Sequence, residues 1–350
     1  MTDCVFPARE INQFRTDLLR WFAAHQRALP WRETRDPYRI WVSEIMLQQT
    51  RVAAVIPYYQ RFLERFPDFH ALARAPEPEL LAHWAGLGYY YRARNLQHAA
   101  RRMSEHGSFP STYDEIRALP GVGGYTAAAV ASIAFDLPHA AVDGNVLRVL
   151  SRVLDERTNI ASGVGRRRFS ALAQEMLDEH QPGAFNQAMM ELGATICLPK
   201  NPHCLLCPVA KLCRARASGT ENELPVKAVR VATVSERRTV FWIEKDDKLL
   251  LWQRPPGERL MPGFWELPEA IHLPDAAPGV KLGSFRHGIT FHSYFFEIWE
   301  AQPPKDIGAC HWVALSRLAS IPVSTILKKA QRQARPGQGG AFRTGLFPLD

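Results

Sequence analysis

Several features are missing from this sequence, and each absence excludes a class of protein. No uninterrupted apolar run approaches the ~20 residues that a membrane-spanning helix needs, so we expect no membrane partner. Residues 1–10 contain no apolar segment typical of a secretory signal, so we expect a cytoplasmic protein. No internal repeat or long low-complexity stretch is visible. With 46% hydrophobic and 22% charged residues, the chain is neither disordered nor collagen-like.

The excess of positive charge is modest and unevenly distributed. A formal net charge of +8 favours a polyanionic partner such as nucleic acid. Residues 1–200 carry 23 Lys+Arg against 21 Asp+Glu, whereas residues 201–350 carry 20 against 14. In the first part, any polyanion site must therefore depend on local arrangement rather than on net charge.

The length of 350 residues suggests two or three domains. In residues 9–215, apolar side chains recur at three- and four-residue spacing between prolines, which predicts an all-α domain of about ten short helices. Residues 216–237 are polar and typical of a linker. Residues 238–335 predict an α+β domain, and residues 336–350 a tail. The strand patterns lie at 239–243, 249–252 and 292–299, with a turn at Asp246-Asp247 and helical patterns at 316–319 and 324–333.

Four of the six cysteines lie within 17 residues, at Cys197, Cys204, Cys207 and Cys213. A secreted disulfide scaffold spreads its cysteines along a short chain, whereas this clustering indicates a metal site in a reducing compartment. Four thiolates suit either one zinc ion or a [4Fe–4S] cluster. The spacing alone does not decide between them.

A glycine-rich segment, Leu119-Pro-Gly-Val-Gly-Gly-Tyr-Thr-Ala127, lies between two helical patterns. Gly121 and Gly123 flank Val122, which predicts a tight turn directly before a helix. The backbone N–H groups at such a helix start form an anion site. A plain connection between two helices is the alternative.

Two carboxylates have both a structural and a functional interpretation. Asp143 precedes an apolar-periodic run, as a helix N-cap does, and Asn145 could cap the same helix. Glu44 lies beside Ile45, so it is either on the polar face of a helix or a partly buried acid. The residues alone leave these alternatives open.

Several motifs resemble a known family. The cysteine spacing resembles the iron–sulfur loop of the endonuclease III superfamily of DNA glycosylases, and the glycine segment resembles a helix-hairpin-helix motif, which grips a DNA phosphate. Over most of residues 9–215 the chain is similar to adenine DNA glycosylases of the MutY type. The motifs that carry this likeness are Leu29–Arg32, Met46–Thr50, Gly86–Tyr90 and Phe185–Gly193.

This resemblance implies removal of adenine mispaired with 8-oxoguanine or guanine from double-stranded DNA, by base flipping, in base excision repair. Glu44 would protonate adenine at N7, and Asp143 would stabilise the cationic sugar, as in glycoside hydrolysis. At Tyr125, bifunctional relatives carry a lysine that forms an imine with the sugar. We therefore expect base removal without efficient strand cleavage.

Further roles follow from the same resemblance. One [4Fe–4S] cluster would be held by the four clustered cysteines. The residues around the adenine and the reacting sugar would be Trp31, Arg32, Tyr125, Asn145 and Glu191. Gln49 and Tyr89 would wedge into the duplex. The backbone of Gly121, Val122 and Gly123, with the Lys200 side chain, would contact DNA phosphates.

The C-terminal domain is similar to the Nudix-like domain of the same family in Leu251–Pro256 and Gly263–Pro268. A hydrolysing Nudix enzyme needs paired glutamates as Mg²⁺ ligands, which do not follow Pro268, so we expect this domain to bind 8-oxoguanine rather than hydrolyse a substrate. Thr290 offers a hydroxyl where the family carries Phe-Ser-His. His287 and His292 are nearby polar candidates.

The expected protein is thus a monomer that associates with the bacterial nucleoid through DNA. One alternative is a related glycosylase that acts on another mispaired base. Glu44 with Gln48-Gln49 argues for adenine, because pyrimidine-specific relatives need not keep that acid. The other alternative is a non-catalytic DNA-binding module with a redox-sensing cluster, and the presence of both acids argues against it.

Overall fold

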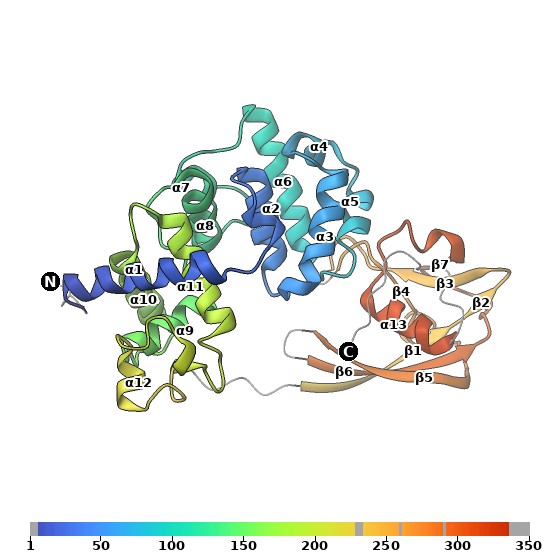
Figure 1. Cartoon of the computed structure of the whole chain (residues 1–350). Helices are drawn as coiled ribbons and strands as arrows, with labels where there is room; N and C mark the ends of the chain where they lie inside the picture. The colour runs from blue at the N-terminus through green and yellow to red at the C-terminus, as the bar shows by residue number, and fades with distance from the viewer. Residues whose placement is uncertain (1–5, 228–233, 259–260, 290–291, 336–350) are drawn as a thin grey trace. The chain divides into compact units, whose positions relative to one another are not determined.

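A computed structural model describes residues 6–227, 234–258, 261–289 and 292–335 (Figure 1). The chain forms two compact units: Met1–Ala73 with Asn95–Val229, and Arg74–Arg94 with Arg230–Asp350. The boundary between them falls inside helix α6 (Tyr91–His106). The domain bounds expected from sequence stay a prediction, and each unit is described separately below.

The first unit is helical, as the periodicity predicted, and residues 6–227 contain no strand. Besides part of α6 it contains α1 (Ala8–His25), α2 (Pro37–Leu47), α3 (Val52–Arg65), α4 (Phe69–Arg74), α7 (Tyr113–Arg117), α8 (Gly124–Phe135), α9 (Gly144–Val153), α10 (Gly163–Met176), α11 (Pro182–Thr195) and α12 (Arg214–Ser218). Two short 3₁₀ turns span Pro30–Arg32 and Cys204–Leu206. The helical part of the fold expectation is therefore confirmed.

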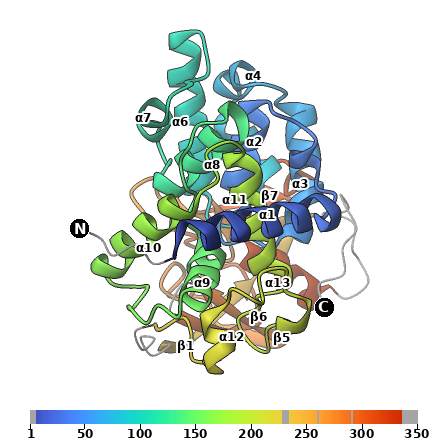
Figure 2. The same ribbon diagram turned by 60° about the vertical axis from the view of Figure 1, so that its left-hand side comes forward.

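The core of this unit forms where α1 crosses α11 (Figure 2) and α9 and α10 pack alongside. In α1 the buried residues follow the spacing of one helix face, from Phe14 through Leu18 to Phe22. They meet Phe169 and Phe185 in one apolar cluster. Burying each such side chain contributes about 1.5–3 kcal/mol, which fixes the helices that carry the pocket residues.

The glycine segment forms a tight turn between α7 and α8. Gly121 has φ +76°, and a Cβ there would lie 2.7 Å from the Cβ of Asn95, so both the backbone conformation and the packing require glycine. Gly123 is the N-cap of α8 and supplies no side-chain cap. The first N–H groups of α8 thus lack a side-chain acceptor from their cap residue.

Helix α2 lies among other helices and is buried around most of its circumference. Asp36 starts it by accepting hydrogen bonds from the backbone N–H groups of Tyr38 and Arg39. The helix packs against α8 and α3, and α8 packs against α11. This packing buries Glu44 near the C-terminal end of α2.

The second unit combines strands and helices, which confirms the α+β expectation for the C-terminal part. It contains α5 (Glu77–Trp84), β1 (Val234–Trp242), β2 (Glu244–Lys245), β3 (Lys248–Gln253), β4 (Trp265–Glu266), β5 (Pro278–Ile289), β6 (His292–Ala301), β7 (Cys310–Ala314), a 3₁₀ turn (Leu315–Arg317) and α13 (Thr325–Ala334). Within this unit Arg94 donates to the Pro262 carbonyl at 2.7 Å, and the Tyr90 ring packs on Phe264. Through these contacts, residues 74–94 belong to the same compact unit as the strands.

Two sheets form the second unit. One has the order β1-β6-β5, with β1 parallel and β5 antiparallel to β6, and α13 packs on β5. The other has the order β2-β3-β4, with β7 also paired to β3. Asp246 and Asp247 form the β2–β3 turn with φ of 51° and 56°. Among the described residues, no helix is long and apolar enough to cross a membrane.

Candidate active site

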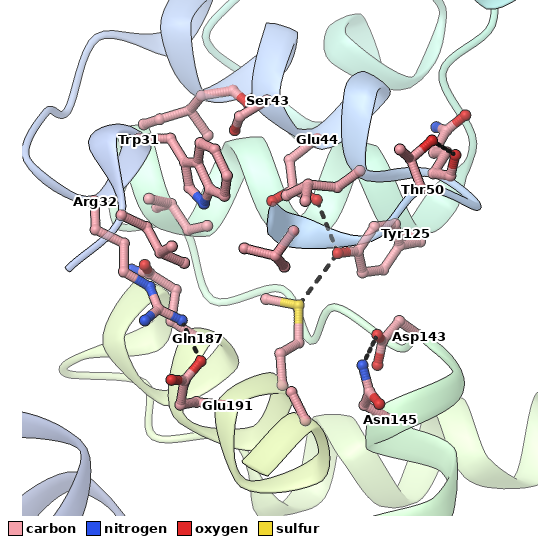
Figure 3. A pocket seen from close by; sticks show the side chains of 18 of the residues that line it. Trp31, Arg32, Ser43, Glu44, Thr50, Tyr125, Asp143, Asn145, Gln187 and Glu191 are labelled. Carbon is pink, nitrogen blue, oxygen red and sulfur yellow. Dashed lines mark hydrogen bonds and ion pairs between the residues drawn. The ribbon is translucent and has the colours of Figure 1, made fainter. Parts of the chain in front are cut away.

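A pocket of about 550 Å³ opens in the first unit between α2, α8, α9 and α11 (Figure 3). It brings together eight of the site residues predicted from sequence, which come from distant segments of the chain. They are Trp31, Arg32, Glu44, Gln49, Tyr125, Asp143, Asn145 and Glu191. A single cavity therefore contains both predicted catalytic carboxylates and the predicted base pocket.

Glu44 is a buried acid, with only 5% of its surface exposed. The Tyr125 hydroxyl donates a hydrogen bond to its Oε2 at 2.8 Å (Figure 3). Burial raises the pKa of the Glu44 carboxyl to about 7, and Asp143 adds to this rise, while the Tyr125 hydrogen bond and the Arg32 charge oppose it. At neutral pH the group therefore exists in both protonated and ionised forms.

Asp143 is the N-cap of α9 and also lines the pocket. Its Oδ1 accepts from the Val146 backbone N–H at 2.8 Å, and its Oδ2 accepts from the Asn145 side chain at 2.9 Å. Burial raises the pKa of the Asp143 carboxyl, and these hydrogen bonds oppose the rise. The Asp143 carboxylate thus caps α9 and lines the pocket at the same time, so the structural role does not exclude a functional one.

Glu191 holds two arginines at the pocket wall. Its Oε1 accepts from Arg27 Nε at 2.7 Å, and its Oε2 accepts from Arg32 Nη2 at 2.8 Å. Burial raises the pKa of Glu191, but the hydrogen bonds from Arg27 and Arg32 outweigh burial and bring it to about 2. Glu191 is therefore a fixed carboxylate that orients the arginines. Trp31 packs edge-on against Tyr59 beside them.

The rim of the pocket follows the end of α2. Gln49 has φ +57°, an uncommon conformation for a residue other than glycine. The preceding Gln48 donates to Thr126 Oγ1 at 3.2 Å, and Thr50 donates to the Gln48 carbonyl at 3.3 Å. These bonds support the unusual backbone at Gln49.

The remaining predicted residues do not line this pocket. Gly121, Val122 and Gly123 form the turn before α8, and Lys200 is exposed in the cysteine loop. Tyr89, with φ +47°, belongs to the second unit and is 38% exposed.

The lesion-reading candidates belong to the C-terminal residues. Thr290 lies outside the described residues. His292 pairs with Glu236 at 2.9 Å, and His287 faces Lys329 at 3.4 Å, so both histidines have protein partners.

The lining residues that the sequence reasoning did not assign to the site include Arg27, Ser43, Thr50, Gln187 and Met190. Two of them had a usable signal, because Gln187 lies one helical turn before Glu191 and Met190 directly precedes it. Met190 Sδ also accepts from the Tyr125 hydroxyl at 3.1 Å. Nothing in the local pattern of Ser43 marks it as a pocket residue.

The four clustered cysteines line a second cavity between α9, α11 and the cysteine loop. All four are free thiols, and Arg152 donates to Cys197 Sγ at 3.3 Å. Across the described part of the chain, no three His, Cys, Asp or Glu side chains lie close enough to share one metal ion. By donor chemistry alone, four thiols around one cavity suit either one zinc ion or an iron–sulfur cluster.

Helix α9 connects the two cavities. Arg148 donates to Asn145 Oδ1 at 2.8 Å and to the Cys197 carbonyl at 2.7 Å. Asn145 in turn donates to Asp143. The orientation of Asp143 therefore depends on bonds that continue into the cysteine loop.

Comparisons with known proteins agree with this geometry. The family model described as "HhH-GPD superfamily base excision DNA repair protein" matches residues 42–175. The adenine DNA glycosylase of Rattus norvegicus is 47% identical, over 97% of this chain and 81% of that protein. That of Schizosaccharomyces pombe is 39% identical, over 93% and 78%. The match to the Mus musculus enzyme is 48% identical but covers only 42% of that protein.

Two solved structures of DNA-acting proteins have a similar fold over about 60% of the chain. A thermostable thymine-DNA glycosylase is 30% identical with a TM-score of 0.55, over 60% of this chain and 98% of that chain. Endonuclease III in a non-covalent DNA complex is 25% identical with a TM-score of 0.53, over 61% and 98%.

Proposed function

We propose that this chain, which belongs to the adenine DNA glycosylase family of the HhH-GPD superfamily, removes adenine mispaired with 8-oxoguanine or guanine in base excision repair. The observation that carries the proposal is one pocket that holds a buried glutamic acid with a pKa of about 7 beside an aspartate. Adenine reaches such a pocket by flipping out of the duplex.

Glu44 is the proton donor in this proposal. Adenine leaves poorly as an anion, so protonation at N7 lowers the barrier to breaking the bond to the sugar. A carboxyl with a pKa of about 7 holds a transferable proton at neutral pH. After transfer, the Tyr125 hydroxyl and the Arg32 charge stabilise the Glu44 carboxylate.

Asp143 stabilises the positive charge that develops on the sugar as the base departs. Hydrogen bonds from the Asn145 side chain and the Val146 N–H fix both carboxylate oxygens before the reaction begins. Preorganised charge of this kind needs no reorientation in the transition state.

The base and the duplex are held by the surrounding residues. Trp31 and Arg32, with Arg32 oriented by Glu191, bind the adenine. Gln49 and Tyr89 wedge into the duplex, and their left-handed backbone presents the side chain at a turn. The Gly121–Gly123 turn binds a phosphate through the first N–H groups of α8, which have no side-chain cap, and Lys200 binds another.

One [4Fe–4S] cluster bound by Cys197, Cys204, Cys207 and Cys213 completes the proposal. The four thiolates would hold the cluster, which would then link the cysteine loop to the segment that follows α11. Arg152 supplies positive charge beside the Cys197 thiolate.

The proposed enzyme is monofunctional. Strand cleavage by this superfamily needs an amine that forms an imine with the opened sugar. Tyr125 has no amine, and its hydroxyl is engaged with Glu44. Robust borohydride trapping on a protein lysine would contradict this proposal.

The direct test is an oligonucleotide duplex with one A·8-oxoguanine pair, incubated with the protein and then treated with alkali. We expect a cut at the adenine. A duplex with a G·T mispair tests the alternative of another base, and Glu44→Gln is the inactive control. No cut in either duplex would favour a non-catalytic DNA-binding module.

We also propose that residues 238–335 form a Nudix-like domain that reads 8-oxoguanine through Thr290. Thr290→Ala should reduce the preference for A·8-oxoguanine over A·G, because a hydroxyl that contacts the lesion is lost. The ratio of the two single-turnover rates measures this preference, and an unchanged ratio would contradict the assignment of Thr290.

A further inference from the structure

We propose that Met190 is a positioning residue for Glu44: its sulfur accepts the Tyr125 hydroxyl hydrogen when Glu44 is protonated, and this favours the protonated form of Glu44. The consequence for adenine excision rests on the function proposed above, whereas the effect on Glu44 itself does not.

The starting point is one hydroxyl group between two acceptors (Figure 3). Tyr125 Oη lies 2.8 Å from Glu44 Oε2 and 3.1 Å from Met190 Sδ. A phenol has a single hydrogen to donate, a carboxylate accepts only, and a thioether accepts weakly. The hydrogen therefore cannot serve both acceptors fully at the same time.

The state of Glu44 decides which acceptor takes the hydrogen. When Glu44 is ionised, Tyr125 donates to the carboxylate, because a charge-assisted bond is stronger than a bond to sulfur. When Glu44 is protonated, its own O–H can donate to Tyr125 Oη, and Tyr125 then donates to Met190 Sδ. Every polar hydrogen in the chain Glu44–Tyr125–Met190 has an acceptor in either state.

Met190 therefore matters in only one of the two states. Without its sulfur, the arrangement in which protonated Glu44 donates to Tyr125 Oη leaves the Tyr125 hydrogen without an acceptor from this triad, whereas the ionised state loses nothing. The other groups that act electrostatically on Glu44 are Asp143 at the start of α9 and Arg32 in the 3₁₀ turn. Neither is hydrogen-bonded to Met190, so a change there leaves them in place.

The test variant is Met190→Leu, which keeps a similar volume and removes the acceptor. We expect the pKa of Glu44 to fall by roughly 0.3–1 unit, the size expected for one modest hydrogen bond. The single-turnover rate of adenine excision should then decline from a correspondingly lower pH. Tyr125→Phe should move the pKa in the opposite direction, because it removes the donor to the carboxylate.

Two controls separate this role from general packing. Met189→Leu changes the neighbouring methionine, which is 2% exposed in the apolar core and does not line the pocket, and should leave the pKa of Glu44 unchanged. Met190→Gln restores an oxygen acceptor and should keep the pKa at or above its original value. In a Tyr125→Phe background, Met190→Leu should add no further shift.

Two measurements keep the inference and the proposed function distinguishable. Infrared titration of the protein without DNA follows the carboxyl band that disappears in Glu44→Gln, and the rate–pH profile follows adenine excision. A downward shift of both on Met190→Leu supports the inference. The inference is overturned if the pKa of Glu44 measured by infrared titration does not change in Met190→Leu. It is also overturned if Met190→Leu shifts this pKa equally in the Tyr125→Phe background. If no adenine is excised at all, the proposed function fails, and the infrared titration still decides the role of Met190.

Discussion

At the scale of single residues, the pocket surrounds two carboxyl groups of similar chemistry with different hydrogen-bond donors. Glu44 accepts a hydrogen bond from the Tyr125 hydroxyl and has a pKa of about 7. Asp143 accepts two hydrogen bonds, from Val146 and Asn145, that oppose the effect of burial. The hydrogen-bond donors around each carboxyl group therefore distinguish the proposed proton donor from the proposed charge-stabilising group.

Asp143→Asn should reduce the single-turnover rate of adenine excision by about 100- to 1,000-fold, the range for loss of one preorganised electrostatic group. DNA affinity and folding should be retained, because asparagine is also a favourable N-cap and can accept from Val146. Ser162→Ala, at the N-cap of α10, is the matched control. It should lower stability by about 1 kcal/mol with no effect on excision. If the Asp143→Asn protein excised adenine at the normal rate, the proposed role of Asp143 in the mechanism would be wrong.

Glu44→Gln should make stability less sensitive to pH. Because the pKa of Glu44 rises from 4.5 to about 7 on folding, its contribution to stability is fully present below about pH 4.5 and is lost as pH rises through about 7. Glutamine cannot ionise, so the variant should gain roughly 3 kcal/mol relative to the original protein between acid and mildly alkaline pH. Urea unfolding at several pH values measures the difference. A pH-independent difference would mean that Glu44 is not buried as an acid.

The sequence predicted Glu44 and Asp143 as site residues but did not predict what surrounds their side chains. Glu44 could have been on a polar helix face, and its burial depends on α8 and α11, which lie far along the chain. For Asp143 the sequence predicts a cap role and a catalytic role that do not exclude each other, and the structure shows the cap and a position in the pocket. The position of Met190 directly before Glu191 was a usable signal for the pocket, but its contact with Tyr125 was not predictable, because a methionine beside a core methionine is typical of ordinary packing.

At the scale of elements, short turns and helix ends carry most of the site. The turn before α8, the start of α9 and the end of α2 each supply a functional group from a position where the backbone is not paired within the helix. The helices themselves supply the rigidity that holds these ends in place.

Gly121→Ala should test the glycine turn. The alanine would take a left-handed conformation, at about 1–3 kcal/mol, and its Cβ would press on Asn95 at 2.7 Å. We expect lower stability and weaker DNA binding. Gly107→Ala is the control, because Gly107 has φ +81° with no atom within 4 Å of an added Cβ. Equal losses of DNA affinity in the two variants would show that backbone strain alone, and not the turn, is responsible.

Elements with a strong local sequence pattern were predictable. Elements whose conformation depends on pairing with another segment of the chain were not. The helical periodicity of residues 9–215 and the Asp246-Asp247 turn were both confirmed. The long strand β5 was missed, because Gly279, Gly283 and Gly288 interrupt any β-branched run. Its conformation depends on pairing with β6, which no local pattern reveals.

At the scale of the whole molecule, the cysteine loop determines how the end of the helical unit is held together. Arg152 donates to the Leu198 carbonyl at 2.6 Å and to the Leu224 carbonyl at 3.2 Å, as well as to Cys197. A buried arginine with these partners joins α9, the loop and the segment after α12. Loss of the proposed cluster would therefore loosen several segments at once.

Cys204→Ser should abolish the brown absorbance of the proposed cluster and lower both the melting temperature and the affinity for DNA. Cys310→Ser is the control, since Cys310 is buried in the second unit and is not one of the four clustered thiols. It should keep the colour. Iron and sulfide analysis of both proteins, with ultraviolet–visible spectra, distinguishes the outcomes. A colourless original protein, prepared without oxygen, would contradict the cluster assignment.

The two arginines held by Glu191 have a consequence for how the pocket balances charge. Its ionisable lining comprises Arg27 and Arg32 as cations, Glu191 and Asp143 as anions, and the Glu44 and Tyr125 side chains. With Glu44 protonated, the lining sums to zero, which suits an uncharged purine. In the proposed reaction, proton transfer from Glu44 would leave −1 on the lining and +1 on the base, so the transfer itself would not change the total charge inside the pocket.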